Sequence, residues 1–173
     1  LLSNEGINGS LSGKIEELEN FLRYVKKELK IKKLNINISN VSFLPFNRLK
    51  VRIKKEIISL GKNNINIKNF RSNHISPSDW HKLIKNKKIK VIDVRNNYEI
   101  SVGKFKNAIN PNTESFREFP KNIDSMKLSK DEDIAIYCTG GIRCEKASLQ
   151  LQQLGYKNVH QLEGGIINYL LYV

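Results

Sequence analysis

YCTGGIR, at residues 137–143, is the stretch that decides how the second half of the chain folds. It follows the apolar β-branched run 133–137 and precedes residues with helical spacing at 144–154, so it predicts a strand, a glycine-rich loop and a helix in succession. A second buried strand is expected at 89–94, and a third at 159–162. Strands that alternate with helices in this way predict an α/β fold with a mainly parallel sheet, whose active sites lie at the carboxyl ends of the strands.

The loop after the expected strand 133–137 contains the candidate nucleophile, Cys138. Successive backbone N–H groups in such a loop form a nest, and the following helix adds its positive N-terminus, so an anion is favoured inside. The first such anion is the thiolate, because a helix N-terminus and a nearby Arg lower the cysteine pKa from about 8.5. Gly140 and Gly141 allow a tight bend with positive φ, and Arg143 is expected to face a bound anion or persulfide. The predicted active-site loop comprises Thr139, Gly140, Gly141, Ile142 and Arg143.

The second cysteine, Cys144, lies in the first turn of the expected helix and leaves two interpretations open. It is either a resolving thiol that closes a disulfide with Cys138, or a small residue in the capping position that Ser or Thr would otherwise fill. We interpret Asp93 and Arg95, at the end of the neighbouring strand, as supporting residues that hold the loop rather than react. No metal site is expected, because the three His are scattered and none has a ligand-like spacing from the cysteines.

The first 75 residues form a more cationic module, with 15 basic and 6 acidic residues in a chain whose net charge is +13. Apolar residues at helical spacing predict a helix over 15–29, and period-two alternation predicts strands at 34–38 and 49–60. One helix and a few strands indicate an α+β module that is too small to be complete. We therefore expect an incomplete N-terminal module at 1–62, a linker at 63–75 and the α/β domain at 76–173.

The basic excess suggests a nucleic-acid partner, although an AT-rich genome would also produce a chain rich in Lys, Asn and Ile. In the expected strand 49–60, alternation projects Lys50, Arg52 and Lys54 to one face, which is either a backbone-phosphate track or a solvated surface. Arg117 lies between two Phe residues, which either offer an aromatic face to a nucleobase or belong to the core.

No apolar run approaches the roughly 20 residues that a bilayer span needs, and no signal peptide is recognisable, so we expect a cytoplasmic protein without a membrane partner. No cofactor motif and no obligatory protein partner are evident in the sequence. The first residue is not Met and the chain stops on an apolar run, so we expect it to belong to a longer polypeptide.

The segment 76–173 resembles a rhodanese domain, on the residues Asp93-Val94-Arg95, Tyr98-Glu99, the cysteine loop, and Leu162-Glu163-Gly164-Gly165-Ile166. More narrowly, the chain resembles the bacterial tRNA uridine hydroxylase family, and this resemblance covers nearly the whole chain. The residues that carry it are CTGGIRCEKA at 138–147, together with EGING at 5–9 and FREFP at 116–120.

The resemblance implies an oxygen-dependent enzyme that converts wobble uridine of tRNA to 5-hydroxyuridine, with Cys138 essential and molecular oxygen as co-substrate. It also implies a ferredoxin-like or acylphosphatase-like N-terminal module, whose first strand we do not expect to find in this stretch of sequence. A sulfurtransferase that carries a persulfide is the alternative, because the loop from Cys138 to Arg143 has six residues. In rhodanese-like proteins a loop of this length suits sulfur, and a loop one residue longer suits phosphate.

Overall fold

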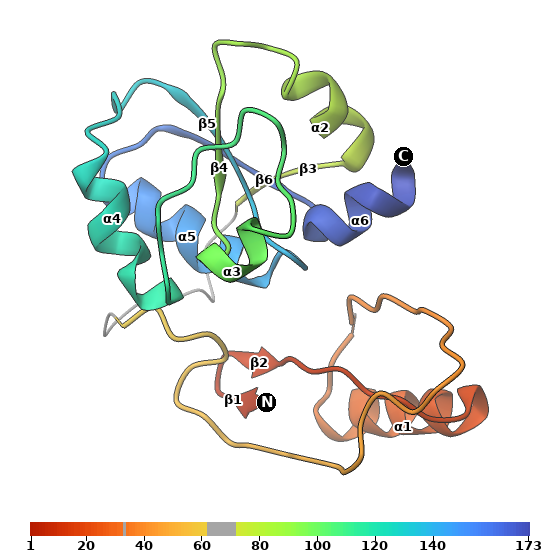
Figure 1. Cartoon of the computed structure of the whole chain (residues 1–173). Coiled ribbons are helices and arrows are strands. Elements are labelled where there is room, and N and C mark those ends of the chain that lie inside the picture. Colours follow the sequence, from red (N-terminus) through yellow and green to blue (C-terminus); the bar gives the residue numbers. More distant parts are fainter. Residues whose placement is uncertain (33, 62–71) are drawn as a thin grey trace. The chain divides into compact units, whose positions relative to one another are not determined.

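The computed structural model describes residues 1–32, 34–61 and 72–173, and these form two compact units, Leu1–Ile57 and Ile58–Val173 (Figure 1). A linker is expected at 63–75, and its residues 63–71 lie outside the described residues. The last residues of the expected linker, Asn73–Ile75, form strand β3 of the second unit.

The second unit is built on a four-stranded sheet in which every pair of neighbours is parallel. The strand order is β3-β6-β5-β4, so β5 lies in the interior of the sheet. Asp93 pairs with Tyr137 in the register of β4 and β5, which brings the ends of these two strands to the same edge. The strands besides β3 are β4 (Lys90–Asp93), β5 (Asp133–Tyr137) and β6 (Asn158–Leu162).

Helices cover both faces of this sheet, with α2 packed against α6 and α4 against α5 (Figure 1). The first of them begins as expected, because the Ser76 hydroxyl accepts a hydrogen bond from the Asp79 N–H at 3.2 Å and Pro77 follows the cap. The helices are α2 (Pro77–Leu83), α3 (Asn97–Ile100), the 3-10 turn η1 (Phe116–Glu118), α4 (Phe119–Ser125), α5 (Ile142–Gln153) and α6 (Gly165–Tyr172).

Strand β5 is buried on both faces, as the centre of a parallel sheet requires. Ile134, Ile136 and Cys138 contribute to one hydrophobic core, with side chains of α4 and α5. Ala135 and Tyr137 contribute to a second core on the opposite face, with side chains of α2 and α6. The α/β fold expected from the alternation of strands and helices is therefore confirmed for this unit.

A buried lysine anchors the first residues of the second unit to α5. Lys146 of α5 donates from Nζ to the Ile58 carbonyl at 2.7 Å, and Leu60 is fully buried in the core that contains Cys138. These contacts explain why the boundary between the two units falls after Ile57.

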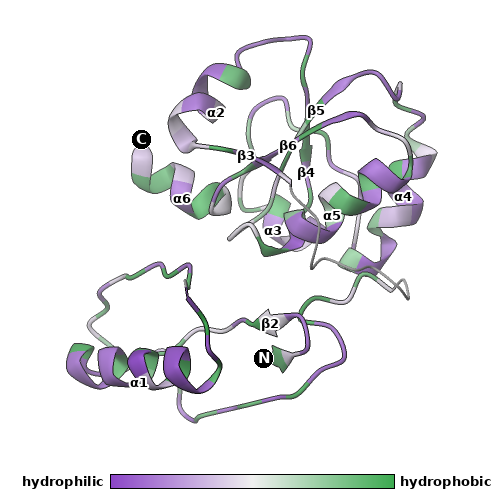
Figure 2. Cartoon of the chain, turned by 180° about the vertical axis from the view of Figure 1, so that it is seen from behind, coloured by the Kyte–Doolittle hydropathy of each residue, from purple (hydrophilic) through white to green (hydrophobic). Residues whose placement is uncertain are grey.

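The first unit contains the expected helix, α1 (Ile15–Glu28), but neither of the strands expected at 34–38 and 49–60. Hydrophilic and hydrophobic residues are mixed along α1 (Figure 2), and Val25 is its buried residue. The unit's strands are β1 (Leu2–Ser3) and β2 (Gly6–Ile7), which pair antiparallel.

The prediction of strands at 34–38 and 49–60 is wrong. Residues 34–60 are irregular apart from one bridge between Leu2 and Ile53. At that bridge the Lys54 N–H donates to the Leu2 carbonyl at 2.8 Å. Alternation of apolar residues does not supply the neighbouring strand that a ladder needs, and the described residues offer 34–38 no such neighbour. Across both units, no described helix is long and apolar enough to cross a membrane.

Candidate active site

Cys138 is the first residue after β5, and α5 begins four residues later at Ile142, so the expected strand, loop and helix are present. The end of β4 lies beside it, because the Val94 N–H donates to the Tyr137 carbonyl at 2.8 Å. The loop therefore opens at the carboxyl edge of the sheet, where α/β proteins place their sites.

The first turn of α6 fixes the backbone of the loop by binding its carbonyl groups. The Ile166 N–H donates to the Cys138 carbonyl at 2.8 Å, and the Ile167 N–H donates to the Thr139 carbonyl at 3.2 Å. The Gly141 N–H donates in turn to the Cys138 Sγ at 3.1 Å. The carbonyls are thus held by α6 while a backbone donor stabilises the sulfur, as a nest requires.

Two glycines make this approach of backbones possible. Gly141 has a φ of 90°, as expected. Gly140 was also expected to have a positive φ, but it does not. Gly165 has a φ of 68°, and a Cβ there would lie 2.5 Å from the carbonyl oxygens of both Cys138 and Thr139. A side chain at residue 165 would therefore displace α6 from the loop.

Cys138 is fully buried and its thiol has a lowered pKa. Burial alone would raise the pKa, but the Cys144 thiol, the Arg143 charge and nearby backbone N–H groups stabilise the thiolate more strongly. Together they lower the pKa from 9.0 to about 6. At neutral pH the sulfur is therefore mostly a thiolate, which is the reactive form of cysteine.

Cys144 stays protonated beside this thiolate. Burial and the negative charge of Cys138 raise the Cys144 pKa well above 9.0, so its S–H donates to Cys138. Both cysteines are free thiols in this structure. The helix N-cap is Gly141, so Cys144 does not occupy a capping position, and its observed role is that of a hydrogen-bond donor.

Glu99 ties the loop to α3 through three short hydrogen bonds. Its carboxylate accepts from Arg143 Nη1 and Nη2 at 2.6 Å each, and from the Thr139 hydroxyl at 2.6 Å. Burial opposes the ionised carboxylate, yet the bonds to Arg143 and Thr139 lower the Glu99 pKa to about 2. Arg143 was expected to face a bound anion, but its two terminal nitrogens instead bind this carboxylate.

Glu99 also belongs to the site, although no role was expected for it from the sequence. A signal was present, because Asn96 and Glu99 form a capping box in which the Asn96 N–H donates to Glu99 Oε2 at 3.2 Å. A capping box directly after β4 places its Glu at the same edge of the sheet as Cys138.

Asp93 and Arg95 form a buried ion pair, with Arg95 Nη2 lying 2.7 Å from Asp93 Oδ2. Arg95 Nη2 also donates to the Gly103 carbonyl at 2.6 Å, and the Tyr137 hydroxyl donates to Asp93. The ion pair therefore holds in place Tyr137, the residue before Cys138, and Gly103, in the turn after α3. These contacts suit the supporting role predicted for both residues.

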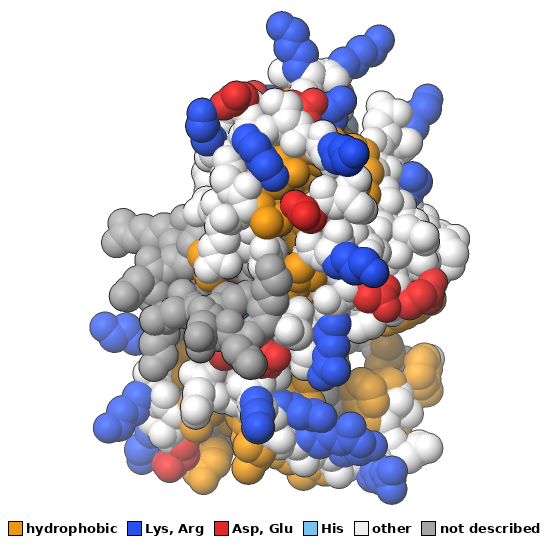
Figure 3. Space-filling view, turned by 90° about the vertical axis from the view of Figure 1, so that its left-hand side faces the viewer, with side chains coloured by type: hydrophobic (Ala, Val, Ile, Leu, Met, Phe, Trp, Pro, Cys, Tyr) orange, Lys and Arg blue, Asp and Glu red, His pale blue; other side chains and the backbone are white. Residues whose placement is uncertain are grey.

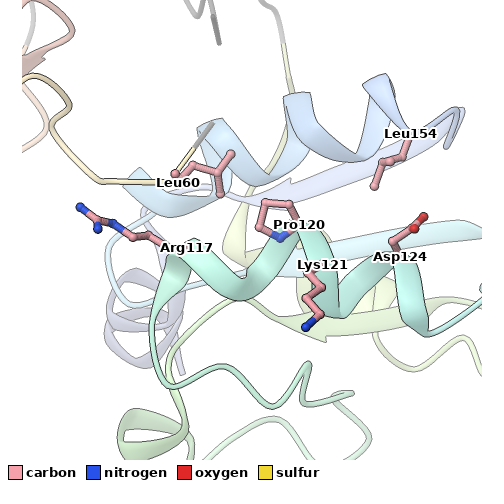
Figure 4. A pocket seen from close by; sticks show the side chains of 7 residues that line it. Leu60, Arg117, Pro120, Lys121, Asp124 and Leu154 are labelled. Atoms are coloured by element: carbon pink, nitrogen blue, oxygen red, sulfur yellow. The ribbon is translucent and has the colours of Figure 1, made fainter. Parts of the chain in front are cut away.

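The predicted RNA-contacting residues lie in both units. Lys50, Arg52 and Lys54 are exposed on irregular backbone of the first unit. Arg117 lies in η1, at the rim of a hollow of about 370 Å³, and its guanidinium extends away from the hollow (Figure 4). Phe116 and Phe119 are buried in the core, so they do not offer the aromatic face considered for a nucleobase.

Among the described residues, no group of three or more His, Cys, Asp or Glu side chains could hold a metal ion. The chemistry available to the residues of this site is nucleophilic attack by the Cys138 thiolate, with Cys144 and the Gly141 N–H as donors to the sulfur.

This fold and loop define a rhodanese-like domain, and the family model described as a rhodanese-like domain matches residues 76–171. A second family model, described as a UPF0176 acylphosphatase like domain, matches residues 1–57. Curated relatives named tRNA uridine(34) hydroxylase match 98% of the chain, at 48% identity in Pelagibacter ubique (strain HTCC1062) and 45% in Rickettsia rickettsii (strain Sheila Smith). The chain belongs to the tRNA uridine(34) hydroxylase family.

The chain spans 56% of the Pelagibacter relative, 62% of a relative from Wolbachia pipientis wMel that is 41% identical over 98% of the chain, and 69% of the Rickettsia relative. Solved structures give the fold alone. A rhodanese-like domain from Anabaena is 19% identical, with a TM-score of 0.50 over 59% of this chain and 76% of that one. A single domain sulfurtransferase from Saccharomyces cerevisiae is 21% identical, with a TM-score of 0.50 over 61% of this chain and 94% of that one.

Proposed function

We propose that the complete protein hydroxylates the wobble uridine of tRNA to 5-hydroxyuridine, with Cys138 as nucleophile and molecular oxygen as co-substrate. The observation that carries the proposal is the Cys138 thiolate, whose pKa is lowered to about 6 in a chain of the tRNA uridine(34) hydroxylase family. A tRNA substrate is consistent with a cytoplasmic protein.

The charge of the chain supports an RNA substrate. The sequence has 30 Lys and Arg against 17 Asp and Glu, and exposed Lys and Arg side chains are visible on each of the two units (Figure 3). Such an excess supplies the sequence-independent part of nucleic-acid affinity. We propose that Lys50, Arg52, Lys54 and Arg117 contribute to this part through backbone phosphates.

The first chemical step of the proposed reaction is addition of the Cys138 thiolate to C6 of the uracil ring. A bond forms between Sγ and C6, and the electron pair of the C5–C6 double bond moves onto C5 and its neighbouring carbonyl. The Gly141 N–H and the Cys144 thiol hold the sulfur before it attacks. C5 then has the enolate character that a reaction with dioxygen needs.

The second step transfers oxygen to C5. The enolate adds dioxygen to give a C5 hydroperoxide, and two electrons from a thiol reductant convert this to a C5 hydroxyl and water. Loss of the C5 proton then expels the Cys138 thiolate from C6 and restores the double bond. In total, uridine, dioxygen and two thiols give 5-hydroxyuridine, water and one disulfide.

The test is to incubate the complete protein with unmodified tRNA, a thiol reductant and ¹⁸O-labelled dioxygen, and to analyse the nucleosides by mass spectrometry. We expect 5-hydroxyuridine that carries one ¹⁸O atom. Unmodified uridine, or a product whose oxygen comes from water, would contradict the proposal.

Sulfur transfer is the second candidate, and the six residues from Cys138 to Arg143 favour it. A persulfide on Cys138 would be stabilised by the same donors as the thiolate. Transfer of sulfur from thiosulfate to cyanide, without formation of 5-hydroxyuridine, would favour this candidate over hydroxylation.

A further inference from the structure

An exposed aromatic residue lies on α3, the helix that clasps the cysteine loop. Tyr98 is 67% exposed, and Val102, four residues later, is 89% exposed. Tyr98 lies within α3, and Val102 lies just after this helix ends at Ile100, so an aromatic and an aliphatic side chain are open to solvent at this turn. Nothing in the site described above uses these two side chains.

Hydrogen bonds made by the residues that follow Tyr98 fix the backbone at this position relative to the cysteine loop. The next residue, Glu99, binds Thr139 and Arg143 of the loop at 2.6 Å, and the Ser101 hydroxyl donates to the Tyr98 carbonyl at 2.8 Å. In Figure 1, α3 lies close to the start of α5, at the edge of the sheet where the loop opens.

Other aromatic side chains in the described part of the second unit are less suited to meet a base. Phe116, Phe119 and Tyr137 are buried in the two cores. Tyr172 is 53% exposed but lies at the last turn of α6, whereas the first turn of that helix holds the loop. Tyr98 thus combines exposure with direct attachment to the loop.

We propose that Tyr98 stacks on the uracil base that Cys138 attacks, as the aromatic platform of the substrate site. This inference rests on the proposed function. An enzyme that reacts with C5 and C6 of a base takes it out of its nucleotide stack, which costs stacking energy. An aromatic ring beside the nucleophile replaces the lost stacking, and it suits uracil because every base offers a π-face.

The test compares three variants of the complete protein in hydroxylation of tRNA: Tyr98→Phe, Tyr98→Ala and, as the matched control, Tyr172→Ala. Removing one base–aromatic stack lowers affinity by about 10- to 100-fold, so Tyr98→Ala should lose about that factor in kcat/KM. Tyr98→Phe keeps the ring and should retain activity, and so should Tyr172→Ala.

A second measurement shows whether the loop itself is intact. Alkylation of Cys138 by iodoacetamide, followed by peptide mass spectrometry, needs no base platform. We therefore expect the same alkylation rate and pH profile in Tyr98→Ala as in the wild type. A slower or shifted profile would mean that Tyr98 acts by supporting the loop, and this would overturn the stacking role.

The outcomes separate the two proposals. If the wild type forms 5-hydroxyuridine and Tyr98→Ala is equally active, the stacking proposal is wrong and the proposed function stands. If Tyr98→Phe loses as much activity as Tyr98→Ala, the hydroxyl and not the ring is needed, which also overturns stacking. If the wild type forms no 5-hydroxyuridine, the proposed function fails, and this inference fails with it.

Discussion

The hydrogen bonds that Glu99 accepts from Arg143 and Thr139, which we call the Glu99 clasp, give a prediction that links the stability of the fold to pH. Replacing Glu99 by Gln keeps the shape of the side chain but removes the charge that binds Arg143 and Thr139. A carboxyl with a pKa of about 2 in the folded state and 4.5 in the unfolded chain stabilises the fold by up to about 3 kcal/mol. Because the Arg143 and Glu99 side chains remain 14% and 15% exposed, water weakens this interaction and we expect a loss of about 2 kcal/mol at pH 7.

The sign of the pH dependence follows from the lowered pKa of Glu99. Its contribution is fully present above pH 4.5 and is lost as the pH falls toward 2. Urea denaturation should therefore show a difference between wild type and Glu99→Gln that is largest at pH 7 and less than half as large at pH 3. Asp131→Asn is the control, because its ion pair with Lys157 is exposed and should contribute little. Equal stability at pH 7, or a difference that persists unchanged at pH 3, would refute the account of the clasp.

Two further predictions concern the loop. The rate of Cys138 alkylation by iodoacetamide should rise with pH through a midpoint at about 6. Cys144→Ala removes the thiol donor and should move this midpoint to higher pH, whereas Cys144→Ser should move it less. A wild-type midpoint near 9.0 would contradict the lowered pKa of Cys138. Gly165→Ala should destabilise the second unit by about 2 kcal/mol or more in urea denaturation, because its Cβ would meet two carbonyl oxygens at 2.5 Å at a positive φ. Gly103→Ala, where a Cβ has nothing within 4 Å, should be close to wild type.

The second unit could be predicted from sequence because several local signals agreed there. The apolar β-branched run before Cys138, the glycines after it and the helical spacing beyond each indicated the same strand, loop and helix. The parallel sheet then followed, since β4 and β5 are largely buried and read as apolar runs, as central strands of such a sheet do.

The first unit could not be predicted in the same way. Alternation in 34–38 and 49–60 indicated strands, but a strand also needs a neighbour, and the described residues of this unit supply only the contact of Leu2 with Ile53. Period-two patterns report which residues share a face, and they do not report whether a partner is present.

The candidate site was predicted in part for a similar reason. The nucleophile and its loop are contiguous in sequence, so spacing identified them. The partner of Arg143 is 44 residues away, at Glu99, and long-range pairs of this kind do not follow from local patterns. Arg143 was therefore expected to meet a ligand, whereas in the structure it meets a carboxylate of the chain itself.

The most direct test of the central claim measures 5-hydroxyuridine in tRNA from cells that lack this gene and carry either the complete wild-type protein or its Cys138→Ser variant. Nucleoside mass spectrometry should find 5-hydroxyuridine with the wild type and none with Cys138→Ser, at equal protein levels. Full modification in cells carrying Cys138→Ser would contradict the claim that the Cys138 thiolate performs the reaction.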